Sequence, residues 1–272
     1  MPDRAPLASA RGGAPGRHGQ EWDLIRAGAR PISEAVNRRF LPALLAFSLV
    51  ALAPVFGTAR GAAPNFIRPE TFDNTVLPAP PAAGSLAALA DLEAVLQVQA
   101  DRTDLQVAWA KRVEKDSVFN NSEILGGWFT SKNLPFTADL FAKVGTDIHA
   151  VSDRIKVLYS RPRPPAIDAR VHPCVTVPET YSYPSGHSMQ AYVWGALLSE
   201  VFPERRAELM ARAYRAAWGR IIGGVHFPTD DIGGRLVGEE LVKELLADPA
   251  LHDALARARA EAQPFMVQAK AA

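Results

Sequence analysis

Residues 181–201, YSYPSGHSMQAYVWGALLSEV, join a short turn to a long apolar segment. Proline, serine and glycine at 184–186 favour a turn, and Ser185 is a good N-cap for a helix predicted at 188–201. A purely structural turn does not need His187. An anion site at a helix N-terminus would use the free backbone N–H groups, a glycine that allows close approach, and the imidazole. The stretch therefore predicts a helix and a candidate anion site at its start.

Apolar residues at helical spacing and good helix formers continue through most of the chain after residue 85. The predicted helical windows are 86–115, 136–160 (one helix or a pair), 188–201, 203–223 and 229–246. Pro203 suits the start of one helix, and Thr229 and Asp230 suit the start of another. No segment shows the convincing alternation of a strand, so we predict an all-α fold, a helical bundle.

Composition and charge place the chain among ordinary globular proteins. Of its 272 residues, 48% are hydrophobic and 22% charged, and the net charge is +1, which implies no nucleic-acid partner. The predicted organisation has four parts: an N-terminal extension at 1–63, a Pro-rich extended lead at 64–84, a helical domain at 85–247 and a C-terminal tail at 248–272. Cys174 is the only cysteine, so no disulfide can form within the chain.

The N-terminal extension has the three parts of a secretory signal peptide. Arg38 and Arg39 precede an uncharged apolar core at 40–56, and small residues follow at 57–63. The core has 17 residues, fewer than the roughly 20 of a full membrane span. We therefore predict a periplasmic or secreted protein. The alternatives are an anchor that is never cleaved and, for the long lead-in, a true start codon near Val36.

Two further stretches carry cations, and the second also holds a histidine and an acid. Lys156 and Arg163 lie in KVLYSRPRP, and Arg220, His226 and Asp230 lie in RIIGGVHFPTD. Each has a structural explanation, because basic side chains often favour helix C-termini and a histidine can simply hydrogen-bond an aspartate. Found together with the 184–187 turn, they indicate a phosphate site, since guanidinium groups match phosphate oxygens and can neutralise a phosphoryl group in transfer.

The three stretches resemble the signature of the type 2 phosphatidic acid phosphatase superfamily, which includes bacterial non-specific acid phosphatases and vanadium haloperoxidases. The family pattern is Lys-six-Arg-Pro, then Pro-Ser-Gly-His, then Ser-Arg-five-His-three-Asp. Only Gly219 departs from it, where the family has serine. The sequence around 181–188 is most similar to the class A acid phosphatases. The resemblance covers about residues 85–247 and implies the all-α fold of the acid phosphatase and vanadium haloperoxidase type.

The resemblance also implies roles for the motif residues. His226 would be the nucleophile that forms a phosphohistidine, Asp230 would orient its ring, and His187 would be the general acid and then the base. The residues implied to bind phosphate are Lys156, Arg163, Ser185, Gly186 and Arg220. The chemistry requires no metal or cofactor. Without the family serine at Gly219, one hydrogen bond worth about 1 kcal/mol would be lost, which predicts weaker phosphate affinity rather than lost activity.

The function predicted from the sequence is a secreted or periplasmic acid phosphatase, a phosphoric monoester hydrolase acting on small phosphomonoesters. A lipid phosphate phosphatase would need several spanning helices, and the region after residue 63 has none. A vanadium-dependent haloperoxidase shares the motifs and stays an alternative. A non-catalytic phosphate-binding protein would need neither histidine. We expect no nucleic-acid binding and no stable membrane insertion after signal cleavage; homo-oligomer formation is left open. The tryptophans predicted in the core are Trp109, Trp128, Trp194 and Trp218.

Overall fold

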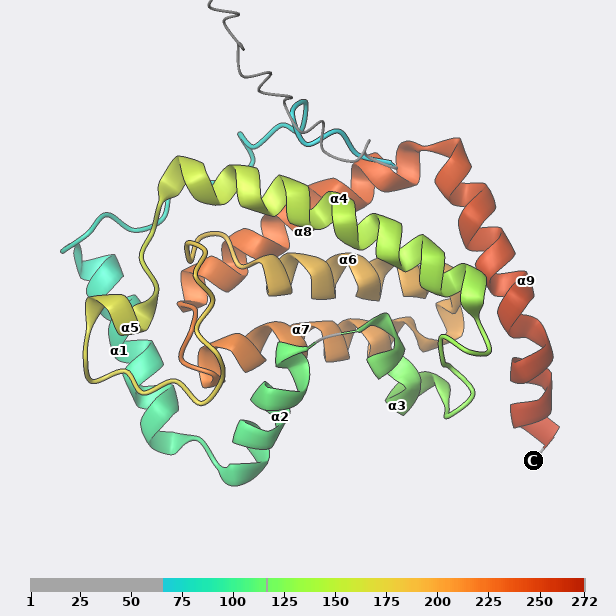
Figure 1. The fold of residues 1–272 in the computed structure, drawn as a ribbon, viewed down its shortest axis with the longest axis horizontal. Coiled ribbons are helices and arrows are strands. Elements are labelled where there is room, and N and C mark those ends of the chain that lie inside the picture. Colours follow the sequence, from blue (N-terminus) through green and yellow to red (C-terminus); the bar gives the residue numbers. More distant parts are fainter. Residues whose placement is uncertain (1–65, 116, 272) are drawn as a thin grey trace, which may run out of the picture. The chain divides into compact units, whose positions relative to one another are not determined.

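The computed structural model describes residues 66–115 and 117–271, and these residues form helices and loops with no strand (Figure 1). The longer helices are α1 Leu86–Asp101, α2 Asp104–Glu114, α4 Pro135–Tyr159, α6 Gly186–Val201, α7 Arg206–Ile222, α8 Pro228–Ala247 and α9 Pro249–Ala271. The short elements are α3 Ser122–Leu125, α5 Pro164–Ile167 and 3₁₀ turns at Val118–Asn121 and Pro203–Arg205. The predicted all-α class is confirmed. Predictions for the signal peptide and for residues 1–63 lie outside the described residues.

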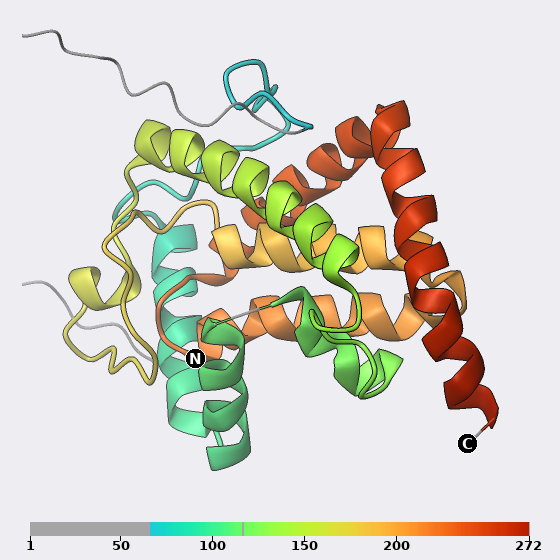
Figure 2. The same ribbon diagram turned by 45° about the vertical axis from the view of Figure 1, so that its right-hand side comes forward.

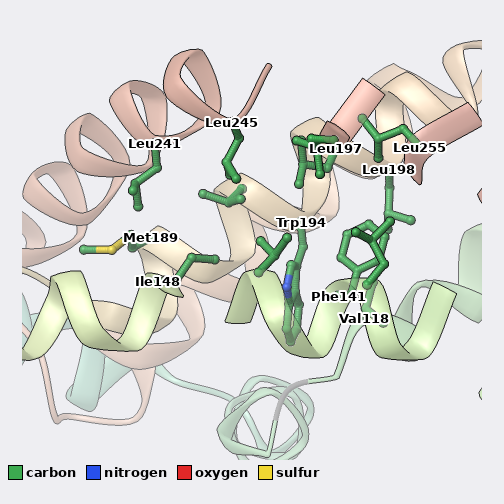
Figure 3. Close-up of a cluster of buried hydrophobic side chains, with 14 of the residues drawn as sticks. Val118, Phe141, Ile148, Met189, Trp194, Leu197, Leu198, Leu241, Leu245 and Leu255 are labelled. Carbon is green, nitrogen blue, oxygen red and sulfur yellow. The ribbon is translucent and has the colours of Figure 1, made fainter. Parts of the chain in front are cut away.

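Helix α6 is the central element of the bundle. It packs most extensively against α7 and α8, and α4 crosses its other side (Figures 1 and 2). Its sequence is apolar on every face, as expected for a helix surrounded by other helices. Its buried side chains meet partners from α4, α8 and α9, including Phe141, Leu241 and Leu255 (Figure 3). Each fully buried side chain of this kind contributes about 1.5–3 kcal/mol, so the core fixes the position of α6.

The arrangement brings four helix ends together on one side of the bundle. The C-terminus of α4, the N-terminus of α6, the C-terminus of α7 and the N-terminus of α8 lie at the same end in both views (Figures 1 and 2). These four ends carry the motif residues. The antiparallel order of α6 and α7 therefore places stretches distant in sequence at one site.

Several element boundaries differ from the predicted ones. The window 86–115 forms two helices, because Thr103 caps α2 in a capping box with Gln106. The predicted helix at 229–246 begins at Pro228, and the Asp230 carboxylate accepts a hydrogen bond from the Phe227 N–H. Ser185 is the N-cap of α6, as predicted. Pro203, which was predicted to begin a helix, begins the 3₁₀ turn that leads into α7.

The C-terminal segment is not an unstructured tail. Residues 249–271 form α9, whose buried side chains are Leu251, Leu255, Ala258 and Ala262. The Glu261 carboxylate accepts hydrogen bonds from the Phe136 and Thr137 N–H groups and so caps the first turn of α4. The helical unit therefore extends past residue 247.

Two other expectations are tested by the described residues. Trp194 is buried, but Trp218 is 44% exposed, so the prediction that all four tryptophans lie in the core is wrong for Trp218. None of the helices in residues 66–115 and 117–271 has both the length and the apolar character that crossing a membrane requires.

Candidate active site

His226 and Asp230 form the centre of the site. His226 lies in the loop between α7 and α8, and its Nδ1 is 3.1 Å from Oδ2 of Asp230 in the first turn of α8. The same carboxylate accepts hydrogen bonds from Ser182 Oγ and the Phe227 N–H. Burial raises the pKa of Asp230, but the hydrogen bonds from His226 and Ser182 and the charge of Arg161 outweigh it, so the pKa lies below its usual value. Asp230 is therefore a carboxylate.

The partners of His226 determine its tautomer. A carboxylate only accepts, so Nδ1 carries the hydrogen that is donated to Asp230. The guanidinium of Arg163 only donates, and its Nη1 lies 3.0 Å from Nε2 of His226, so Nε2 presents a lone pair. Burial, and then the charges of Arg163 and Lys156, lower the pKa of His226 well below its ordinary value, against the opposing effect of Asp230. The ring is neutral, with its nucleophilic nitrogen facing a guanidinium.

A second buried ion pair supports Asp230 from behind. Arg161 donates from Nη1 to Asp230 Oδ1 at 2.6 Å and from Nη2 to Asp91 Oδ2 on α1 at 2.7 Å. Thr229 also donates to the Asp91 carboxylate. The sequence analysis missed Arg161, although it stands in the same RPRP stretch as Arg163, and it missed Asp91, for which the sequence offers no signal. Helix α1 is thereby connected to the candidate site through the charges of Asp91 and Arg161.

Lys156 and Arg163 hold the backbone of the loop that leads to Pro184. The ammonium group of Lys156 donates to Tyr181 O at 2.6 Å and Pro184 O at 2.8 Å, with Ser182 O at 3.4 Å. Arg163 Nε donates to Thr180 O at 2.7 Å. Burial, and then the charge of Arg163, lower the pKa of Lys156 to about 7. Lys156 and Arg163, which were predicted as phosphate ligands, therefore hold the loop backbone. The contact of Lys156 with Ser182 O is the longest, so it is the one most easily exchanged for a phosphate oxygen.

Arg220 differs from these two cations. It lies in the last turn of α7 and is 1% exposed. Its Nε and Nη1 are buried and have no hydrogen-bond partner among the described residues. Burial lowers its pKa, against the charges of Glu114 and Asp231. Buried donors left unpaired are costly, and an oxyanion that accepts from both nitrogens would remove that cost. Arg220 is the clearest sign in the structure of an anion site.

His187 lies in the first turn of α6, and its Nε2 is 3.1 Å from the carbonyl oxygen of Glu114 at the end of α2. A carbonyl only accepts, so Nε2 carries a hydrogen and Nδ1 is left as the position that gains or loses a proton. Burial, and then the charge of Arg220, lower the pKa of His187 to about 4. A phosphate dianion beside the ring would raise that pKa again.

Gly219 has a packing role that the motif comparison did not consider. A Cβ atom built at Gly219 would lie 2.6 Å from Cγ2 of Val113, where α2 crosses α7. Glycine therefore lets α2 lie close against α7. The next residue of α2 is Glu114, whose carbonyl contacts His187, so the close approach also places the hydrogen-bond partner of the predicted general acid.

The structure thus brings the predicted residues into one region, although not all into direct contact. Arg163, His226 and Asp230 form a continuous chain of contacts, and the Ser185 N–H donates to Asp230 O at 2.9 Å. Gly186 begins α6, and a Cβ there would lie 3.0 Å from Ser152 Oγ. Neutral imidazole, ionised carboxylate, unpaired guanidinium and a helix N-terminus together suit nucleophilic attack on a phosphoryl group.

Comparison with known proteins finds relatives among phosphatases. Residues 140–246, which include every predicted site residue, match the PAP2 superfamily model. The chain is 30% identical over 145 residues to a non-specific acid phosphatase of Salmonella typhimurium, and 30% identical over 146 residues to one of Providencia stuartii. Each alignment covers 52% of this chain and 58% of the relative, so the chain spans little more than half the length of the curated relatives it matches. The resemblance found in the motifs is confirmed.

Among solved structures, a bacterial vanadium-dependent iodoperoxidase superimposes with a TM-score of 0.52 at 20% identity. The match covers 63% of this chain and 52% of that chain. At this identity the likeness shows a shared fold.

Proposed function

Because the chain carries a PAP2 superfamily domain at residues 140–246, we propose that it is an acid phosphatase that hydrolyses phosphomonoesters through a phosphohistidine. One observation carries the proposal. His226 is buried as the neutral tautomer with its Nε2 lone pair toward Arg163, and Nδ1 is tied to Asp230. A structural histidine does not need a cation beside its free nitrogen, whereas a cation there would hold a negatively charged phosphoryl group against the nucleophile once the phosphoryl group displaces the Arg163 contact. The acid phosphatase relatives support the same reaction class.

In the first step, Nε2 of His226 attacks phosphorus and the bond to the leaving oxygen breaks. The new P–N bond leaves a positive charge on the ring, which the Asp230 carboxylate stabilises through Nδ1–H. His187, protonated at Nδ1 beside the dianion, gives its proton to the leaving alkoxide. Such proton transfer contributes about 10²–10⁴-fold.

In the second step, His187 is neutral and takes a proton from water as the water attacks phosphorus. The P–N bond breaks, its electron pair returns to Nε2, and phosphate leaves. Arg163 and Arg220 stabilise the negative charge of the equatorial oxygens in both steps, with Lys156 and the α6 N-terminus adding to the field. Ser185 would add a hydroxyl hydrogen bond. The fold holds these groups close to the reaction centre, and phosphate binding has to displace the Arg163 contact at Nε2 of His226 before attack.

An acid pH preference follows from His187. The pKa of His187 is held at about 4 by burial and by Arg220. The first step requires the imidazolium, whose population falls as the pH rises. A bound phosphate dianion raises the pKa of His187, but the pH range in which the imidazolium is populated stays on the acid side. This is consistent with an acid phosphatase.

The proposed location, periplasmic or secreted, rests on the signal-peptide pattern at Arg38–Phe56. The proposed substrates are small phosphomonoesters, because the centre is enclosed: His226 and Arg220 are each 1% exposed. Cell fractionation with an antibody against the folded domain tests the location. Retention of an uncleaved chain in the membrane would contradict it.

Rapid-quench kinetics with an activated aryl phosphate test the mechanism. His226→Ala should give no turnover and no phosphoenzyme. His187→Ala should still be phosphorylated, because a phenolate needs no acid, but hydrolysis should be slow, so acid-labile, base-stable phosphate accumulates after a burst of phenol. His252→Ala, a change at an exposed histidine on α9, is the matched control and should behave as wild type. A phosphoenzyme in His226→Ala would refute the assignment.

A further inference from the structure

The mechanism leaves one carboxyl of the site unused. Asp231 follows Asp230 in the first turn of α8, and its Oδ1 is hydrogen-bonded to Ser188 Oγ on α6. Ser188 Oγ is in turn 2.8 Å from Ser185 Oγ, and the Ser188 N–H donates to Ser185 Oγ at 3.2 Å. A chain of side chains therefore runs from Asp231 through Ser188 to the hydroxyl of the Pro-Ser-Gly-His turn. Gly234 makes this possible, because a Cβ there would lie 2.9 Å from Ser188 Cβ and closer still to the Ser185 carbonyl oxygen.

Counting hydrogens shows that this chain has two possible directions. Ser188 Oγ has one hydrogen and stands between two oxygens, so it can donate to only one of them. If Asp231 is ionised, Ser188 donates to it, and Ser188 Oγ and the carboxylate both compete for the Ser185 hydrogen. If Asp231 is the neutral acid, it donates to Ser188 and Ser188 donates to Ser185. Only in the second direction does the Ser185 hydrogen have no competing acceptor in the chain.

We propose that Asp231 is a positioning residue of the phosphate site: as the neutral acid it sets the direction of the Ser188–Ser185 hydroxyl chain, so that Ser185 donates to a phosphoryl oxygen. This inference rests on the proposed function, because it requires phosphate to bind at Ser185. It adds to the mechanism a group that does not touch substrate. Ionisation of Asp231 reverses the chain, so that Ser188 and the carboxylate compete with phosphate for the Ser185 hydrogen.

The surroundings of Asp231 favour the neutral acid. Burial and then the charge of Asp230 raise its pKa well above the ordinary value, against the hydrogen bonds of Ser188 and Ser185 and the charge of Arg220. A pocket of about 280 Å³ between α6, α7 and the start of α8 is lined by Asp231 and Ser188. Its other titratable or charged side chains are Tyr192, Tyr214 and Arg235, and Arg235 is paired with Glu239. Asp231 can exchange its proton with solvent here, whereas Ser185 and Ser188 are buried.

The experiment measures the affinity of the full protein for inorganic phosphate by titration calorimetry across pH. The Asp231→Asn variant has a side-chain amide that can donate to Ser188 at every pH. The Asp231→Leu variant has no hydrogen-bonding group at this position. We expect Asn to equal wild type at acid pH and to bind more tightly at alkaline pH, with a limiting ratio of about ten-fold, the value of a weak hydrogen bond to a charged acceptor. We expect Leu, which neither donates to Ser188 nor accepts from it, to lose this pH dependence and to bind more weakly than Asn, because Ser188 then competes for the Ser185 hydrogen. The ratio of two proteins at one pH cancels the ionisation of phosphate itself.

Two further variants separate positioning from folding. In a Ser185→Ala background, Asp231→Leu should cause no additional loss of affinity, because the hydroxyl that would donate to phosphate is already absent. Glu240→Gln, which removes a carboxylate on α8 that pairs with Lys243, is the charge control and should leave the pH profile unchanged. Equal affinities of wild type, Asn and Leu at every pH, or an equal effect of Leu with and without Ser185, would overturn the inference. Wild type that binds no phosphate would instead refute the proposed function.

Discussion

The close contact of α2 with α7 at Gly219 leads to our most specific prediction. A Cβ at Gly219 would lie 2.6 Å from Val113 Cγ2, well inside van der Waals contact. Val113 is 1% exposed and β-branched, so its side chain cannot rotate away within the helix. Overpacking of a buried site costs about 1–3 kcal/mol. We therefore expect Gly219→Ala to lower the free energy of unfolding by that amount, and Gly219→Ser to do the same despite restoring the family residue.

The second consequence is kinetic. Relief of the clash moves α2 away from α7 and lengthens the hydrogen bond from His187 Nε2 to Glu114 O. Hydrolysis of an alkyl phosphate, which needs the acid, should fall by up to about 10²-fold, within the range of general acid catalysis. Formation of the phosphoenzyme from an activated aryl phosphate should change far less. Urea unfolding and rapid-quench kinetics measure the two effects separately.

A compensating variant makes the reasoning falsifiable. Val113→Ala removes the clashing methyl groups and alone should cost about 1.5 kcal/mol or more, at roughly 0.8 kcal/mol per buried methyl. The double variant Gly219→Ala/Val113→Ala should be more stable than the sum of the single effects predicts, by about 1–3 kcal/mol. Strict additivity, or a Gly219→Ala protein with wild-type stability and wild-type alkyl-phosphate kinetics, would refute the packing argument.

Three other results are expected. Arg161→Gln should destabilise the fold by about 3–5 kcal/mol, because it leaves Asp91 and Asp230 as buried unpaired charges, whereas Arg170→Gln at an exposed ion pair should be nearly neutral in urea unfolding. The pKa of His187 is about 4 in the folded chain and 6.5 ordinarily, so between these pH values the unfolded chain binds more protons and stability falls as the pH falls. His187→Gln should flatten this slope in melts followed across pH. Turnover should survive EDTA, and vanadate should inhibit as a mimic of five-coordinate phosphorus; oxidation of halide by the vanadate-loaded protein would favour the peroxidase alternative.

The sequence alone was sufficient to predict the all-α fold class and most of the helices. The reason is that apolar side chains recur at the helical period, which depends on local backbone geometry alone. It failed where the pattern is ambiguous. The segment that forms α9 was predicted only as a C-terminal tail. Two of the four α9 residues described as buried are Ala258 and Ala262, and an alanine in a sequence does not distinguish a buried face from an exposed one. The break at Thr103 depends on a capping box of only four residues, Thr103 to Gln106.

The candidate site divides in the same way. The residue types, and the contact of His226 with Asp230, follow from motif spacing, since His226 directly precedes the N-cap of α8 and Asp230 lies in the first turn of that helix. Three contacts around them join residues much further apart: Arg161 to Asp91 across 70 positions, His187 to Glu114 across 73 and Ser188 to Asp231 across 43. The second and third of these contacts lie where helices approach closely because Gly219 and Gly234 lack a Cβ. The sequence determined which chemical groups are present. Only tertiary packing decided which hydrogen bonds hold them, because a hydrogen bond forms or is lost when the distance between two helices changes by a few tenths of an ångström, and no residue pattern encodes such small differences.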